Sequence, residues 1–141
     1  MEAASPARVL VVAHATAATP ALLDSVAARA AQAPAVFTLL VPASPQGLER
    51  LVGADNPDSS ESDAVLALAL PLLEEAAGAP VTGQAAASGP LEAIQDAINV
   101  HGFDEIILST LPVHVSRWLH IDLPHKIGGL GLPVTTVTAR G

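Results

Sequence analysis

The sequence predicts a protein of the α/β class, in which a parallel β-sheet is covered by helices on both faces. Short runs of β-branched and other aliphatic residues alternate with segments of helical periodicity along almost the whole chain. The runs are continuous, which is typical of strands buried on both sides. Strands and helices that alternate in this way form βαβ units with right-handed crossovers.

Five strands are expected. The first, residues 8–13, is a valine-rich apolar run after Arg8, of the kind found inside a parallel sheet. The third, residues 81–87, alternates and is rich in alanine, which suits an edge of the sheet. The predicted strands cover residues 8–13, 36–41, 81–87, 106–109 and 134–138.

Four helices are expected between these strands. Thr19 and Pro20 are typical of an N-cap followed by proline at the first helical position. Pro90 begins another helix in the same way, with Glu92 in the first turn, where the helix dipole favours an acid. Pro71 lies inside the second helix and is expected to kink it or split it in two. The predicted helices cover residues 20–33, 62–77, 90–101 and about 122–130.

The length of 141 residues predicts a single domain that spans residues 1–141. Residues 44–62 are rich in Pro, Gly, Asn, Asp and Ser and are mostly acidic. We expect them to form a flexible surface loop, which either connects two elements through solvent or closes over a site.

Composition excludes several classes of function. The net charge of −8 argues against binding to nucleic acid and to anionic membrane surfaces. The absence of cysteine excludes disulfides, thiol catalysis and cysteine-based zinc sites. The apolar runs at residues 9–13 and 64–73 are too short for a secretory signal and a membrane span, respectively. We therefore expect a soluble, cytoplasmic protein.

The order and spacing of the predicted elements resemble the universal stress protein family, of the adenine-nucleotide-hydrolase-like α/β superfamily. The resemblance covers nearly the whole chain. It is strongest at Gly89-Pro90 with Ile94 and Ile98, at the run Phe103-Asp104-Glu105-Ile106-Ile107-Leu108, and at Leu132-Pro133-Val134. It implies a Rossmann-like three-layer sandwich with strand order 3-2-1-4-5, and a homodimer that pairs through the last strand.

The resemblance also implies where a ligand would bind. ATP-binding members carry an Asp at the end of strand 1, a backbone edge for adenine at the end of strand 2, and a Gly-x2-Gly-x9-Gly-Ser/Thr run after strand 4. Here His14, directly after Ala13 at the end of the first strand, stands in place of that Asp, and Val41 stands at the end of the second strand. Ser109 and Pro112 stand at the first two glycines.

The phosphate-binding motif of the family is not retained. His120 and Ile121 stand near the Gly-Ser/Thr pair, so no motif glycine remains. These glycines let backbone amides approach phosphate oxygens, and Pro112 has no amide to offer. Asp122 is positioned as the N-cap of the following helix, where its carboxylate would repel a phosphate. We therefore expect no ATP binding by the usual motif.

A smaller anionic ligand fits the same region better. Arg117 would supply a bidentate fork, and Ser109, Thr110 and Ser116 would supply hydroxyl groups, with His14 facing the same crevice. The candidates are AMP or another nucleoside monophosphate, ATP held in another way, or a simple phosphate group. This is the one cation-rich segment of an acidic chain, with His114, Arg117, His120, His125 and Lys126.

Each of these residues also has a purely structural interpretation. Ser116 is equally suited to cap a short helix through Trp118, and Arg117 to pair with Asp122. Ser109 and Thr110 are equally suited to bond the backbone of their own loop. These alternatives stay open.

The sequence favours neither a metal site nor catalysis. The histidines lack the spacing of three or four residues that places two ligands on one helix face. No Gly-x-Ser-x-Gly elbow is present, and the neighbouring acids Asp104 and Glu105 are typical of a solvated strand end. His101 continues the apolar face of the third helix, so we expect it to be partly buried.

Three hypotheses for function follow. The first is a universal stress protein-like module that binds a small anionic ligand, or responds to stress, without turnover. The second is a ligand-free scaffold that forms homodimers through residues 134–138. The third, suggested only by the wider superfamily, is a nucleotide hydrolase that depends on His14.

Overall fold

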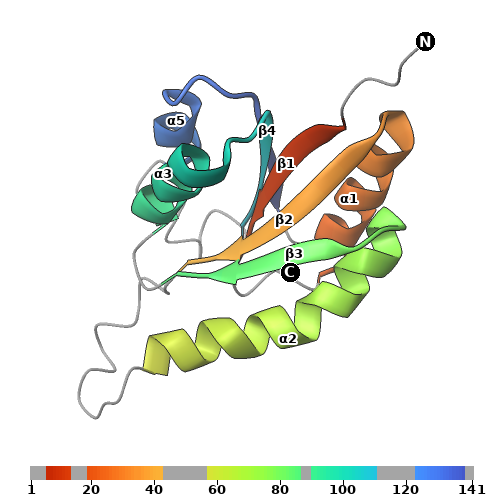
Figure 1. Cartoon of the computed structure of the whole chain (residues 1–141), viewed down its shortest axis with the longest axis horizontal. Helices are drawn as coiled ribbons and strands as arrows, with labels where there is room; N and C mark the ends of the chain where they lie inside the picture. The colour runs from red at the N-terminus through yellow and green to blue at the C-terminus, as the bar shows by residue number, and fades with distance from the viewer. Residues whose placement is uncertain (1–5, 14–18, 43–56, 87–89, 111–122, 139–141) are drawn as a thin grey trace.

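The protein forms a five-stranded, fully parallel sheet with strand order β3-β2-β1-β4-β5, as predicted (Figure 1). The structure, a computed structural model, describes residues 6–13, 19–42, 57–86, 90–110 and 123–138. β3, the alternating and alanine-rich strand, lies at one edge as expected, and β5 lies at the other. The strands are β1 Ala7–Val12, β2 Ala35–Val41, β3 Val81–Ala85, β4 Glu105–Thr110 and β5 Val134–Thr138.

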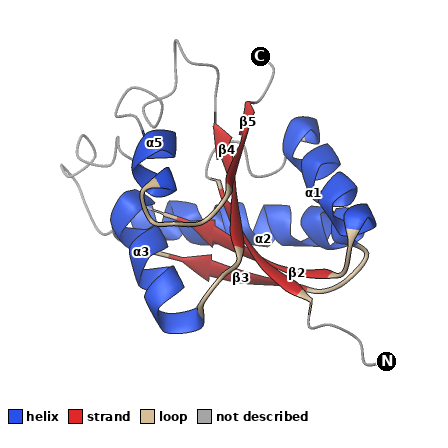
Figure 2. Cartoon of the chain, turned by 90° about the horizontal axis from the view of Figure 1, so that it is seen from above, coloured by secondary structure: helices blue, strands red, loops and turns tan. Residues whose placement is uncertain are grey.

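Helices cover both faces of the sheet. Figures 1 and 2 show α1 and α2 on one side of the strands, with α3 and α5 on the other. The sequence signals at the helix starts are confirmed, because α1 begins at Pro20 and α3 begins at Pro90 with Glu92 in its first turn. The helices are α1 Pro20–Gln32, α2 Pro57–Ala77, α3 Pro90–His101 and α5 Leu123–Gly128.

The strands alternate between two hydrophobic cores. On the α1 and α2 side, Val9, Val11 and Ile107 of the central strands pack with the helices. On the α3 and α5 side, Leu10 and Ile106 do the same. Because helices cover both faces of the sheet, the central strands have apolar side chains on both faces, and their sequences are continuous apolar runs and not alternating ones.

α2 differs from the prediction. It begins at Pro57, so residues 57–62 are helical and do not belong to the predicted loop. The rest of that loop, residues 44–56, lies outside the described residues. Pro71 does not split the helix, which continues to Ala77, although Figure 1 shows its C-terminal part turning away from the direction of its N-terminal part. Pro71 is exposed, so its ring projects away from the core.

The connection from α3 to β4 turns at Gly102. Its φ of +77° lies in the left-handed region, and its N–H donates to the carbonyl of Ile98 at 2.9 Å, which ends the helix. His101, expected to be partly buried, is exposed, and its ring meets the edge of Phe103 at 6.3 Å between centroids. The apolar face of α3 therefore ends before His101.

Candidate functional site

The candidate site lies at the carboxyl ends of β1 and β4. These strands are neighbours in the centre of the sheet, with Val12 opposite Leu108. The chain leaves β1 toward β2 on one side and leaves β4 toward β5 on the other, so the connections diverge here. Ligands of open parallel sheets bind at such a point, because the two departing connections leave a crevice between them.

Ser109 and Thr110 end β4 at this edge and are almost fully buried, with exposures of 1% and 2%. Strand alternation sends them to opposite faces. Ser109 shares its face with Ile107, toward α1 and α2, whereas Thr110 shares its face with Leu108, toward α3 and α5. The pair of hydroxyl groups predicted from the sequence is thus divided between the two layers.

The hydroxyl of Thr110 stands out among these groups. Within the described part of the chain, its Oγ1 is a buried side-chain oxygen without a hydrogen-bond partner. A buried hydroxyl in that state costs about 1–3 kcal/mol relative to one that is hydrogen-bonded. Native structures rarely retain such a group without a reason, and one reason is a polar ligand that pairs with it.

Ala13 and Val41 lie on the same face as Ser109, and both are fully buried. The N–H of Ala13 donates to the carbonyl of Leu40 at 3.2 Å, and the N–H of Ala86 donates to the carbonyl of Val41 at 3.0 Å. The backbone at the end of β2 is therefore already part of the sheet. The carbonyl of Val41 retains one lone pair that an adenine amino group would be able to use.

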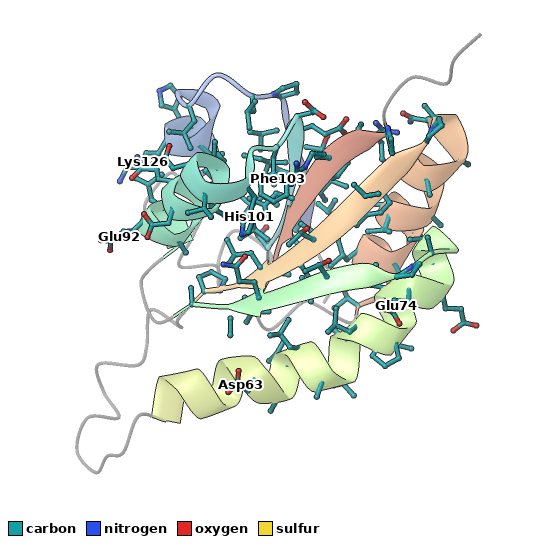
Figure 3. The ribbon with its side chains drawn as sticks, viewed as in Figure 1. Asp63, Glu74, Glu92, His101, Phe103 and Lys126 are labelled. Carbon is teal, nitrogen blue, oxygen red and sulfur yellow. The ribbon has the colours of Figure 1, made fainter. Side chains whose placement is uncertain are left out.

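The remaining predicted site residues, His14, Ser116 and Arg117, lie outside the described residues, as do Pro112, His120 and Ile121. The end of the cation-rich segment is described, because α5 carries it. Ile127 is fully buried and holds α5 against the sheet, while His125 and Lys126 are exposed (Figure 3). Two of the predicted cations therefore lie on the outer surface of α5.

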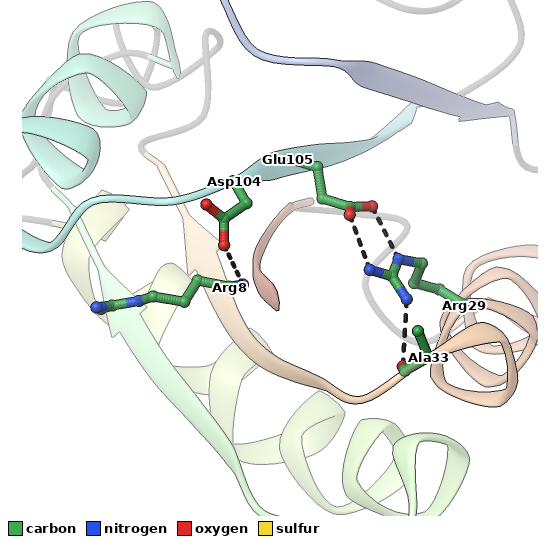
Figure 4. A network of polar contacts seen from close by, with 5 residues as sticks. All are labelled: Arg8, Arg29, Ala33, Asp104 and Glu105. Carbon is green, nitrogen blue, oxygen red and sulfur yellow. Dashed lines mark hydrogen bonds and ion pairs between the residues drawn. The ribbon is translucent and has the colours of Figure 1, made fainter. Parts of the chain in front are cut away.

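A set of polar contacts that the sequence did not predict lies at the opposite, amino edge of the sheet (Figure 4). Glu105, the first residue of β4, accepts two hydrogen bonds from Arg29 of α1, Nε to Oε1 at 3.0 Å and Nη2 to Oε2 at 2.9 Å. Asp104 Oδ2 accepts a hydrogen bond from the backbone N–H of Arg8 at 2.8 Å. The expectation of a solvated end is therefore wrong for Glu105, which is partly buried in this ion pair, whereas Asp104 is exposed as expected.

These contacts hold the layers together. The hydrogen bonds to Glu105 raise the pKa of Arg29 above its usual value, burial opposes them, and the charge of Glu105 adds a further increase. The guanidinium of Arg8 lies 5.6 Å from the ring centroid of Phe103, within cation–π range. No local sequence signal marks the Arg29–Glu105 pair, because its members are 76 positions apart.

Among the residues that the structure describes, no group of three or more His, Asp or Glu side chains is placed to hold a metal ion. None of the helices in this part of the chain combines the length and hydrophobicity that a membrane crossing requires.

Two solved structures are similar to this chain over nearly its whole length. One is the universal stress protein from Archaeoglobus fulgidus, with a TM-score of 0.65 and 14% identity, covering 93% of this chain and 93% of that chain. The other is the universal stress protein from Archaeoglobus fulgidus in complex with dAMP, with a TM-score of 0.60 and 14% identity, covering 94% of this chain and 98% of that chain. No family profile and no curated protein matches the sequence. At this identity the likeness establishes a universal stress protein-like, Rossmann-like fold.

Proposed function

We propose that this chain is a universal stress protein-like module that binds a small anionic ligand, of the nucleoside monophosphate class, without turnover. The observation that carries the proposal is the buried hydroxyl of Thr110, which has no hydrogen-bond partner among the described residues at the carboxyl end of β4. A phosphate oxygen or a ribose hydroxyl would satisfy it. The structurally similar protein in complex with dAMP supports this choice of ligand class.

The binding mode we propose relies on side chains. Because no motif glycine is present, the phosphate would be held by Arg117 and by the hydroxyls of Thr110 and Ser116, whereas Ser109 faces the other layer. His14 and Ala13 would border the ligand at the end of β1, and Val41 would offer its carbonyl to the base. One phosphate suits this donor set, whereas a triphosphate would meet the carboxylate of Asp122. We therefore expect AMP to bind more tightly than ATP.

Isothermal titration of the purified protein with AMP, ATP and inorganic phosphate tests the proposal. We expect saturable binding of AMP, and Arg117→Ala should weaken it about tenfold or more, because an arginine–phosphate pair is lost. Lys126→Ala is the matched control, since it removes an exposed cation from α5 and should change the affinity little. Absence of AMP binding at millimolar concentration would exclude this function, and phosphate release from ATP that is lost in His14→Ala would favour a hydrolase instead.

A second candidate function, a dimeric scaffold, is favoured by the free edge of β5. Thr135, Thr136 and Thr138 are exposed. The N–H of Ile106 donates to the carbonyl of Pro133 at 3.0 Å, so the carbonyl of Pro133 points toward β4. Successive residues of a strand point their backbone groups to opposite sides, so those of Thr136, three residues later, point away from β4. A second copy would be able to pair with these groups across a two-fold axis.

Proline substitution tests this dimer. Thr136→Pro removes an N–H that faces outward, so it should abolish dimers without breaking the β4–β5 ladder. Ala85→Pro on β3 is the matched control. The N–H of Ala86 donates to β2, so the N–H of Ala85 points away from β2, toward the outer edge of β3. Light scattering should report a monomer for Thr136→Pro and a dimer for Ala85→Pro. An equal mass for the two variants would exclude β5 as the interface.

A further inference from the structure

The outer face of α2 is apolar where a surface helix is normally polar. From residue 64 to residue 73 the helix contains only Ala, Val, Leu and Pro. One side of this run serves the core, because Ala69 and Leu73 are buried against the sheet. A helix needs only one apolar side for that purpose, yet apolar residues on the other side of α2 remain exposed.

Four of these residues form a continuous strip, which we call the α2 stripe. It consists of Ala64, Leu68, Pro71 and Leu72, whose spacing places them on one side of a helix. All four are exposed, Leu68 at 66% and Leu72 at 37%. Single exposed leucines are ordinary, but two leucines one turn apart beside an alanine and a proline form a patch of the kind that marks interaction sites.

Two acidic residues, Asp63 and Glu75, flank the stripe along the chain, and both are exposed. Glu75 comes seven residues after Leu68 and lies on the same side of the helix, whereas Asp63, one residue before the stripe begins, lies about a quarter turn to the side. Figure 3 shows Asp63 in the N-terminal part of α2 and Glu74 in the C-terminal part, where Glu74 accepts a hydrogen bond from the N–H of Val81 at 3.1 Å. The helix contains five acidic residues and no basic one. A helical rise of 1.5 Å per residue puts positions 63 and 75 roughly 18 Å apart.

We propose that the α2 stripe is a docking site for an amphipathic helix of another protein, with apolar residues at its centre and lysine or arginine at both ends. The apolar centre would cover Leu68 and Leu72, one basic end would lie over Glu75, and the other would reach Asp63 at the side of the stripe. Burial of the leucines supplies the attraction, and the charges select the partner and accelerate its encounter.

Charge also argues against two other occupants. A second copy of the chain would place one acidic helix against another, whether the two helices ran parallel or antiparallel, because α2 has acidic residues in both halves and no basic residue. An anionic membrane surface would be repelled by the same residues and by the net charge of −8.

Fluorescence anisotropy with designed peptides tests the proposal on the full chain. The probe is a labelled alanine-based helical peptide with two leucines one turn apart at its centre and lysines at both ends, and the control peptide carries glutamates in place of the lysines. We expect saturable binding of the basic peptide alone. Leu68→Gln should weaken this binding about tenfold or more, as for a central apolar contact. Glu75→Gln should weaken it less and reduce its sensitivity to salt.

Val100→Gln is the matched control variant, because Val100 is 74% exposed on α3, on the opposite side of the sheet. Both substitutions place the same good helix former at an exposed position, so far-ultraviolet circular dichroism should confirm that both variants fold. Equal binding of the two peptides, or equal affinity of Leu68→Gln and wild type, would overturn the proposal. A dimer mass that is lost in Leu68→Gln but kept in Thr136→Pro would overturn it in favour of a second copy.

Discussion

The hydroxyl of Thr110 gives the sharpest test of the carboxyl-edge site, because its removal should change stability and binding in opposite directions. Thr110→Val keeps the branched shape of the side chain and removes only the hydroxyl. Since that oxygen is buried without a partner among the described residues, the ligand-free variant should be more stable than wild type by about 1 kcal/mol or more. For a chain of this size, this corresponds to a rise in Tm of roughly 3–5 °C.

Ligand binding should respond in the other direction. In the proposed complex the hydroxyl donates a hydrogen bond to an anionic oxygen, and such a bond contributes about 1.5–3 kcal/mol. Its loss should raise the Kd for AMP about 10- to 100-fold. At an AMP concentration of 100 times the wild-type Kd, wild type gains about 2.7 kcal/mol of stability, whereas a variant with a tenfold higher Kd gains about 1.4 kcal/mol. The stability advantage of the variant should therefore shrink or reverse when AMP is added.

Differential scanning calorimetry with and without AMP measures both effects, and isothermal titration checks the Kd. Thr82→Val is the matched control, because Thr82 is exposed on the edge strand β3 and its hydroxyl reaches water. That variant should keep the wild-type response to AMP. Two results would refute the reasoning: a Thr110→Val protein less stable than wild type without ligand, or an AMP-induced rise in Tm equal to that of wild type.

Three further predictions concern the fold. In a double-mutant cycle of Arg29→Met and Glu105→Gln, chemical denaturation should give a coupling energy of about 1–2 kcal/mol, because the two-point ion pair is only 15% and 25% exposed. Because the pKa of Arg29 is raised in the folded protein, the ion pair contributes its full stabilisation at any pH below the pKa of Arg29 in the unfolded chain. The coupling energy should therefore not fall between about pH 7 and 10, and a fall there would contradict the ion pair as its source. Gly102→Ala should lower the free energy of unfolding by about 1–2 kcal/mol, because the φ of +77° is strained for any residue with a Cβ. Gly128→Ala is the control and should not lower it, since an added Cβ there meets nothing within 4 Å. Equal melting temperatures for the two variants would contradict the strain at Gly102. Gly83→Ala should cost roughly 1 kcal/mol in the same assay, because its Cβ would come within 2.7 Å of a leucine methyl of α2, and an unchanged midpoint would mean that this leucine turns aside freely.

The central strands were predictable because their chemistry is local. Continuous runs such as residues 8–13 and 36–41 need no knowledge of distant residues to be identified as buried strands. The start of α2 was missed because residues 57–62 are polar and resemble a loop, although Pro57 followed by Asp58 is a helix-start signal. In that segment, the positional signal of Pro57 outweighs the loop-like composition.

The candidate site was predictable only in part. Strand order and the carboxyl-edge rule are sufficient to place the ends of β1 and β4 side by side, and the structure does pair Val12 with Leu108 there. The sequence does not reveal that Ser109 and Thr110 face opposite layers in the finished sheet, nor that the Thr110 hydroxyl is without a partner among the described residues. Both facts depend on packing between segments that are distant in the chain, as does the ion pair of Arg29 with Glu105.

The two proposed sites lie on different layers, which determines how they should interact. Thr110 faces α3 and α5, whereas the stripe centred on Leu68 faces outward from α2, with the sheet between them. Coupling between two sites requires an element with two arrangements that both ligands bias, and a packed sheet held at its amino edge by Arg29 and Glu105 offers little freedom of that kind. We therefore expect Leu68→Gln to leave the Kd for AMP unchanged, and saturating AMP to leave peptide binding unchanged. A shift of threefold or more in either titration would mean that α2 moves when the carboxyl edge is occupied, and the module would then transmit ligand binding to its partner.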